Sequence, residues 1–238
     1  YEYPSGLCYD WNRTNRMINA TLIDHMGTDL SVVNAARVSF NKTSNWELTD
    51  WRDSEDYARK EVLSEADTKL INYLAKHKHT SPFGHCFASF HIKAPVFVAR
   101  QLVKHKFLRW NEISRRYVDD EPEFYVPDVW RGRSADKKQG SDKDLEVWWD
   151  EGLQFGRPLS VYRRMLDEGV APEMARMVLP QSTMTEWYWS GSLDAFADMC
   201  NLRCAGDTQL ETRLVANQIC NSMKELFPVS WFALRLEK

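Results

Sequence analysis

The sequence has no run of apolar residues that approaches the length of a membrane-spanning helix (about 18), and no charged-then-apolar leader opens it. We therefore expect a cytoplasmic protein with no membrane partner. The chain also lacks a basic excess, because its formal net charge is −3. General nucleic-acid binders carry strong positive charge, so no nucleic-acid partner is expected either. Neither an internal repeat nor a low-complexity tract occurs.

Cysteine is scarce, and motifs for metal binding are missing. The five cysteines are odd in number and contain no Cys-x-x-Cys pair, which is typical of reduced, mostly buried thiols. Four histidines lie between residues 77 and 91, but no Glu or Cys completes a known ligand set, and His-x-Glu and His-Glu-x-x-His are absent. We predict no metal site, and we interpret Cys86, Cys200 and Cys204 as core residues rather than nucleophiles.

The composition, 43% hydrophobic and 27% charged over 238 residues, is that of an ordinary globular protein with ample core. Apolar periodicity and turn residues predict alternating strands and helices. Strands are expected at 20–24, 86–92 and 185–190. Helices are expected at 30–36, 64–78, 95–107, 145–167 (interrupted near Pro158), 172–179, 193–204 and 208–227. Loops are expected at 41–56, 109–117 and 130–143. Tryptophan-rich segments, 148–149 and 187–189, are expected to lie partly in subunit contacts.

One stretch of the sequence carries concentrated positive charge. Residues 100–116 hold six cationic side chains and one histidine, with Glu112 as their only carboxylate. A helix that begins at Pro95 places Arg100 and Lys104 on one side, and it runs into a polar loop. The alternative is that these charges form a solvent-exposed basic surface with no ligand. The aromatic residues Trp110 and Tyr117 disfavour this alternative, because they argue against a wholly exposed segment. This stretch is therefore a candidate receptor for an anion such as a nucleotide.

Two more arginines lie in apolar surroundings. Arg176 is embedded in Met-Ala-Arg-Met-Val-Leu, and Arg203 in Cys-Asn-Leu-Arg-Cys. An arginine is rarely buried without an anionic partner. That partner is either an acidic side chain of the protein or a bound ligand, and the residues alone leave both open.

These blocks resemble the flavin-dependent thymidylate synthases. Lys104-His105-Lys106, seven residues and then Ser114 is similar to the family signature Arg-His-Arg, seven residues, Ser. Other blocks match in family order: 34–40, 80–85, 90–101, 123–127 and 175–180. The resemblance implies a lead-in over 1–17 and a single catalytic domain over 18–238. It implies an α/β fold with a central, mainly antiparallel sheet flanked by helices, and a homotetramer whose subunits share each active site.

The resemblance also implies a reaction, reductive methylation of dUMP to dTMP. Methylenetetrahydrofolate would give the carbon and reduced FAD the hydride, with NADPH recharging the flavin. Ser114, Arg203 and Glu112 would be catalytic. Nucleotide contacts carried over by position are Arg100, Gln101, Glu112, Ser114, Arg115, Arg116, Arg176 and Arg203. Flavin contacts carried over in the same way are Ser81, Lys104, His105, Lys106, Glu112, Ser192 and Asp198.

The sequence departs from the family on the flavin side. Lys104 and Lys106 replace two arginines, which keeps the charge but loses the planar fork. Carboxylates stand at Asp194, Asp198 and Asp207, where the family has neutral or cationic groups. One alternative within the fold is therefore a deoxypyrimidine monophosphate hydroxymethyltransferase. Alternatives from other classes are a non-catalytic nucleotide-binding relative and an RNA binder.

Overall fold

A central antiparallel sheet organises the computed structural model, which describes residues 17–53, 56–135, 140–147 and 151–235. Its strand order is β1-β4-β8-β5, with bounds Asn19–Met26, Phe87–Pro95, Met184–Ser192 and Arg109–Glu112 respectively. Strands β4 and β8 pair along their whole length, from Phe87 opposite Ser192 to Pro95 opposite Met184. This confirms the expectation of a mixed α/β domain with an antiparallel sheet.

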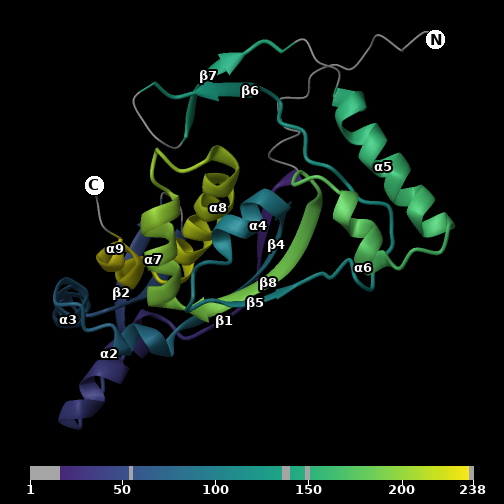
Figure 1. Ribbon diagram of the computed structural model, residues 1–238. Coiled ribbons are helices and arrows are strands. Elements are labelled where there is room, and N and C mark those ends of the chain that lie inside the picture. The colour runs from purple at the N-terminus through teal and green to yellow at the C-terminus, as the bar shows by residue number, and fades with distance from the viewer. Residues whose placement is uncertain (1–16, 54–55, 136–139, 148–150, 236–238) are drawn as a thin grey trace.

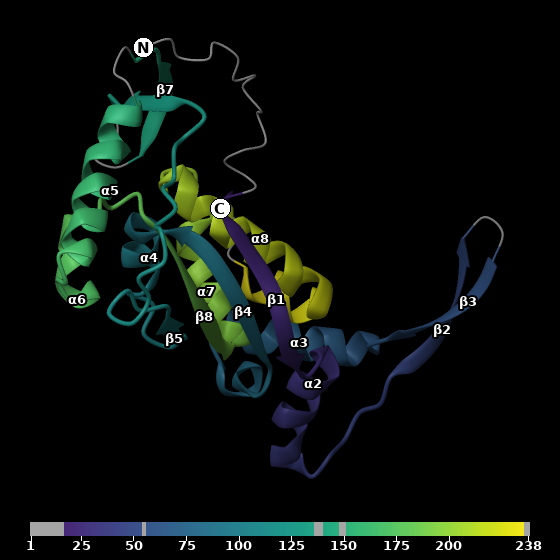
Figure 2. The same cartoon turned by 90° about the vertical axis from the view of Figure 1, so that its right-hand side faces the viewer.

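The alternation in β4 explains which face of the sheet is covered. Ala88, Phe90 and Ile92 are buried, as predicted from their period of two. Helices α4 (Val96–Leu102), α7 (Leu193–Arg203) and α8 (Leu210–Leu226) pack against the sheet (Figures 1 and 2). Phe196 of α7 meets Phe90 at a ring distance of 5.3 Å and Trp189 at 5.8 Å, both edge-to-face.

A second group of helices lies at one end of the sheet (Figure 1): α2 (Asp29–Arg37), α3 (Glu65–Lys76) and α9 (Pro228–Leu234). Pro228 ends α8, as predicted, but it also begins α9, because proline suits the first turn of a helix. The buried Asp29 accepts hydrogen bonds from the backbone N–H groups of Val229 and Ser230, both 2.9 Å long. This carboxylate therefore caps α9 and ties it to α2.

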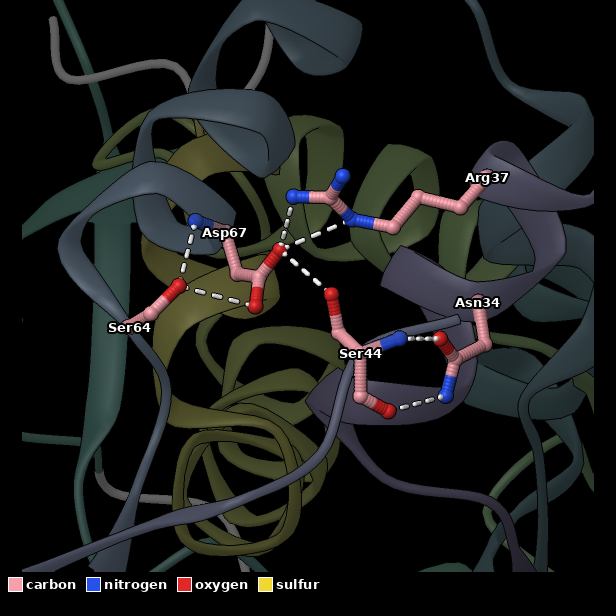
Figure 3. Close-up of polar contacts among 5 residues, drawn as sticks. All are labelled: Asn34, Arg37, Ser44, Ser64 and Asp67. Atoms are coloured by element: carbon pink, nitrogen blue, oxygen red, sulfur yellow. Dashed lines mark hydrogen bonds and ion pairs between the residues drawn. The ribbon is translucent and has the colours of Figure 1, made fainter. Parts of the chain in front are cut away.

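Asp67 is the polar centre of the same region (Figure 3). Ser64 caps α3 by accepting a hydrogen bond from the Asp67 N–H at 3.1 Å. The Asp67 carboxylate, 3% exposed, accepts from Arg37 at 2.5 Å, from Ser44 at 3.0 Å and from Ser64 at 2.8 Å. Asn34 binds the backbone of Ser44 in both directions. The network holds the segment after α2 against α3.

Three segments expected as loops contain strands instead. Within 41–56 the chain starts the hairpin β2 (Glu47–Asp53) and β3 (Asp56–Val62), which projects from the body (Figure 2). Within 109–117 it forms β5, and the two ends of 130–143 pair as β6 (Trp130–Arg133) and β7 (Ser141–Leu145). These strands are polar or short, so they carry no apolar alternation. Backbone pairing, rather than burial of one face, forms them.

Other expectations need correction or lie outside the description. Helix α5 (Glu151–Asp167) continues through Pro158 instead of breaking there. In the segment 187–189, expected to lie partly in subunit contacts, Trp187 and Trp189 are 1% and 0% exposed and belong to the core of the chain itself, whereas Tyr188 is 50% exposed. Residues 1–16 of the expected lead-in, and Trp148 and Trp149, lie outside the described residues. No helix in the described ranges is long and apolar enough to cross a membrane.

Candidate active site

The first candidate site is a cavity of about 720 Å³ that we call the arginine cavity. It lies between helix α4, the segment after β5, and the turn that follows α6 (Pro172–Ala175) and leads into β8. Most of the residues expected to hold the nucleotide line it: Arg100, Glu112, Ser114, Arg115, Arg116 and Arg176. The fold therefore gathers residues that are up to 76 positions apart in the sequence.

The arginines of this cavity have no acidic partner among the described residues. Arg116 Nε donates to the Ser114 hydroxyl at 3.0 Å. Arg115 and Arg176 donate to backbone carbonyls, those of Asp120 (2.8 Å) and Glu173 (3.2 Å). The alternative of a structural ion pair, left open for Arg176 by the sequence, is thus absent from this part of the chain. Unneutralised guanidinium groups around one cavity favour an anionic ligand.

Glu112 is the carboxylate of the arginine cavity, and two donors orient it. The Thr185 hydroxyl donates to Glu112 Oε1 at 2.7 Å, and the indole N–H of Trp110 donates to Oε2 at 3.2 Å. Trp110 itself stacks on the buried Trp187, with ring centroids 4.4 Å apart. Because strand β5 pairs with β8, a rigid sheet holds the carboxylate at the wall of the cavity.

A second cavity, of about 910 Å³, lies on the other side of helix α4, and we call it the aromatic cavity. The walls are formed by Phe97, Tyr125, Trp130 and Phe155, and Pro180 and Gln181 border both cavities. Three predicted site residues line this cavity instead of the arginine cavity: Gln101, Lys104 and Arg203. Within one chain the structure therefore divides the expected nucleotide contacts between two adjacent cavities.

Arg203 and His105 form a pair between α7 and the end of α4. Arg203 Nε donates to His105 Nε2 at 3.2 Å, and Arg203 Nη2 donates to the Gln101 carbonyl at 3.2 Å. Burial, together with the Arg203 charge, lowers the pKa of His105 to about 4. The imidazole is therefore neutral near pH 7, with its proton on Nδ1. Arg203, like Arg176, has no carboxylate partner among the described residues.

The remaining predicted flavin contacts lie in separate places on the chain. Lys106 is exposed beyond α4. The Ser192 hydroxyl donates to Asp194 at 2.5 Å at the start of α7. Burial, and then the charge of Asp194, raises the pKa of Asp198. Ser81 lines a third cavity, of about 1000 Å³, together with residues of α2 and α3.

The aromatic cavity contains charged residues that sequence reasoning missed. Glu211, 2% exposed, accepts from Arg131 at 2.5 Å and from the Tyr125 hydroxyl at 3.1 Å. Arg131 lies in β6, inside a segment expected to be a loop, and Glu211 lies in the first turn of α8. The buried face of α8 also contains Thr212 and Val215. The burial of Glu211 could have been predicted only if the buried face had been placed one residue further along the helix than the stripe of apolar residues suggests.

Metal-binding groups are absent from the described part of the chain: no three of its His, Cys, Asp and Glu side chains converge on one point. Cys86 and Cys200 are buried, in agreement with their interpretation as core residues. The polar chemistry of the site is thus that of arginine, lysine and an oriented carboxylate. Two cavities lined by arginine and lysine beside the sheet of a mixed α/β domain fit a protein that binds an anionic ligand.

Comparison with known proteins gives the family. The profile described as "Thymidylate synthase complementing protein" matches residues 21–229. The flavin-dependent thymidylate synthase of Thermus thermophilus is 39% identical over 217 residues, which are 89% of this chain and 73% of that protein. The enzyme of the same name from Kosmotoga olearia is 39% identical over 221 residues, 89% and 87% of the two chains.

Comparison with solved structures gives the same family. The UMP/dUMP methylase PolB from Streptomyces cacaoi, bound with 5-Br dUMP, is similar with a TM-score of 0.70 and 32% identity, and the match covers 91% of this chain and 94% of that one. The chain therefore belongs to the flavin-dependent thymidylate synthase family, and it is a methyltransferase.

Proposed function

We propose that this enzyme makes dTMP from dUMP by reductive methylation, with methylenetetrahydrofolate as the carbon donor and reduced FAD, regenerated by NADPH, as the hydride donor. The observation that carries the proposal is the arginine cavity. Arg100, Arg115, Arg116 and Arg176 surround it without acidic partners in the described chain. A nucleotide monophosphate is a dianion, which guanidinium groups bind through paired, charge-assisted hydrogen bonds.

The polar groups of the site also fit activation of the pyrimidine. Carbon C5 of uracil attacks an electrophile only when negative charge on the ring oxygens is stabilised. Arginine side chains around the ring would supply that stabilisation without a covalent cysteine. Glu112, oriented by Thr185 and Trp110, offers a fixed acceptor for a ring N–H. The buried state of Cys86 and Cys200 supports a mechanism that uses no thiol.

The residues present fit FAD in part. The Lys104 and Lys106 ammonium groups are exposed and form no ion pair in the described ranges, so they can bind a pyrophosphate as point charges. Ser192 and Asp198 would face hydroxyl groups of the cofactor, because a serine hydroxyl and a carboxylate both accept hydrogen bonds. His105, neutral near pH 7, adds no charge there. When bound, FAD supplies the hydride.

We further propose that each active site is completed by more than one subunit of a homotetramer. The support is the division of the expected contacts. Arg176 and Arg203 line different cavities, and Ser81 lies in a third. In one chain these groups cannot all reach the same small ligand. A neighbouring subunit that brings its aromatic cavity to an arginine cavity would unite them.

The second candidate is hydroxymethyl transfer to the same nucleotide, without net flavin reduction. The pair Asp194 and Asp198 favours it, because each carboxylate disfavours charge on the other and both oppose a pyrophosphate. Without a hydride, the one-carbon unit attached to C5 would take up water, giving a hydroxymethyl nucleotide.

An anaerobic assay separates the two candidates. Purified enzyme is given dUMP, methylenetetrahydrofolate and NADPH, with or without FAD, and the nucleotides are identified by mass spectrometry. We expect dTMP only when FAD is present. A hydroxymethylated nucleotide formed without flavin would contradict the proposal. UMP in a parallel reaction shows whether the ribose 2′-hydroxyl is accepted.

A further inference from the structure

The residue that begins helix α8 has a side chain that does not serve its own helix. Gln209 is the N-cap residue of α8, where serine, threonine, aspartate and asparagine are favoured, and its side chain forms no capping hydrogen bond. Instead, Gln209 Oε1 accepts a hydrogen bond of 2.5 Å from Nε2 of the Gln101 side chain. Both residues line the aromatic cavity. The Gln209 side chain therefore acts on the wall of this cavity.

Gln101 connects this contact to the residues that we expect to bind the nucleotide. Its backbone carbonyl accepts a hydrogen bond from Arg203 Nη2 at 3.2 Å. In its side chain, the amide nitrogen is turned toward Gln209, so the amide oxygen Oε1 is turned away from it. No donor from the described residues bonds to this oxygen. Gln101 thus offers a ligand in the aromatic cavity a hydrogen-bond acceptor.

A buried ion pair fixes the end of the helix that carries Gln209. Glu211, in the first turn of α8, is 2% exposed and accepts from Arg131 at 2.5 Å and from the Tyr125 hydroxyl at 3.1 Å. Arg131 Nε also donates to Ser141 Oγ of the paired strand β7 at 2.9 Å. These contacts attach the start of α8 to the β6–β7 hairpin. The backbone of Gln209 is therefore held in place on both sides of the cavity wall.

The chemistry of dUMP decides which of its groups Gln101 Oε1 can bind. Phosphate oxygens are negatively charged acceptors, so a carbonyl oxygen disfavours them. The neutral hydrogen-bond donors of dUMP are the ring N3–H and the sugar 3′-hydroxyl. In the shared active site proposed for this enzyme, Glu112 accepts the ring N–H, because Thr185 and Trp110 hold its carboxylate in the arginine cavity. The donor that remains for Gln101 is the 3′-hydroxyl.

We propose that Gln209 is a positioning residue for nucleotide recognition, which holds the Gln101 amide so that Oε1 accepts a hydrogen bond from the sugar 3′-hydroxyl. This inference rests on the proposed function, because it takes dUMP as the ligand. Gln209 acts through Gln101 and not on the nucleotide itself. A side chain that is already ordered loses less conformational entropy when the ligand binds, so the acceptor contributes more to affinity.

The experiment compares two nucleotides on the full chain. Isothermal titration calorimetry measures the dissociation constants of dUMP and of 2′,3′-dideoxyuridine monophosphate, which lacks the 3′-hydroxyl. Their ratio isolates the 3′-hydroxyl contact, because a change in the charge of the cavity affects both nucleotides alike. For the wild type we expect the dideoxy nucleotide to bind about 5-fold more weakly, as for one hydrogen bond of ordinary strength.

Three variants of Gln209 test the positioning role. Gln209→Met keeps the length of the side chain but removes the amide acceptor, and Gln209→Lys offers only donors, so in both the ratio should fall below about 2-fold. Gln209→Glu offers only acceptors and still binds the Gln101 amide nitrogen, so it should keep the wild-type ratio. A purely structural role of Gln209 would not separate the acceptor variant from the others in this way.

Gln218→Met is the matched control in the same helix. The Gln218 side chain bonds to the backbone of Ile18 and Ala20 and lines none of the three cavities. This variant should lose stability but keep the wild-type ratio, and circular dichroism verifies that each protein is folded. A wild-type ratio near 1, an unchanged ratio in folded Gln209→Met or Gln209→Lys, or a lost ratio in Gln209→Glu would overturn the inference while dUMP binding persists. Absence of dUMP binding to the wild type would contradict the proposed function itself.

Discussion

Replacement of Arg176 by alanine tests whether this side chain binds a ligand or supports the fold. Arg176 is exposed, and its only hydrogen bond in the described chain is to the Glu173 carbonyl at 3.2 Å. A hydrogen bond to a charged group contributes roughly 1.5–3 kcal/mol. Arg176→Ala should therefore weaken dUMP binding by about 10- to 150-fold. Its free energy of unfolding should change by no more than about 0.5 kcal/mol, because no buried contact is lost.

Isothermal titration calorimetry with dUMP and urea unfolding of the same samples provide the two measurements. Arg176→Lys separates charge from fork geometry, and it should recover only part of the affinity. Arg164→Ala is the matched control, since Arg164 is an exposed arginine paired with Glu168 at 2.7 Å within α5. That variant should bind dUMP like the wild type and lose only a few tenths of a kcal/mol of stability. If Arg176→Ala unfolds readily yet binds dUMP normally, the ligand-binding interpretation fails and the residue is structural.

Three further expectations concern stability and assembly. Asp67→Ala should cost about 3 kcal/mol, since it leaves Arg37 without its buried partner. Burial raises the pKa of Asp67, but bonds from Arg37 and two serines lower it further. This stabilisation is therefore complete above the unfolded-state pKa of about 3.9, and it is lost as the pH falls through the lower pKa of the folded state. In urea unfolding, the difference in unfolding free energy between variant and wild type should therefore be smaller at pH 3 than at pH 7. Gly191→Ala should lower the melting temperature by an amount that corresponds to about 1–3 kcal/mol, because its Cβ would lie 2.4 Å from Leu108 Cδ2. Gly84→Ala is the control and should leave the melting temperature unchanged, since its Cβ would have no neighbour within 4 Å. Equal melting temperatures for the two variants would disprove the clash. Light scattering should show an assembly larger than the 27.9 kDa chain, and a clean monomer would remove shared active sites from the account.

The core of this fold could be predicted well from the sequence, because apolar residues recur at regular spacing in the strands and helices that bury one face. Strand β4 alternates between buried and more accessible residues, and α3 lies within the helix predicted over 64–78. The hairpins failed for the opposite reason. Strands β6 and β7 pair through their backbones and bury little, so their sequences look like loops. The interruption predicted near Pro158 was wrong, because tertiary context can override the helix propensity of a single residue.

The candidate site was predictable in composition but not in arrangement. Motif spacing identified Ser114, and the apolar residues around Arg176 singled out that arginine; both line one cavity. No spacing rule could place Arg203 on the other side of α4, since that depends on how α7 packs against the sheet. Glu211 was missed because a buried carboxylate at the start of a helix has the same sequence signature as an exposed one. Its partner, Arg131, comes from a hairpin that the sequence did not predict.

A single turnover with reduced flavin tests the proposed reaction most directly. Enzyme reconstituted with FAD is reduced without oxygen, freed of NADPH, and mixed with dUMP and methylenetetrahydrofolate. The visible absorbance of oxidised flavin and the mass of the nucleotide product are recorded on the same sample. If FAD is the hydride donor, one dTMP forms for each flavin oxidised, and Arg176→Ala slows both signals equally. Formation of a hydroxymethyl nucleotide while the flavin stays reduced would contradict reductive methylation.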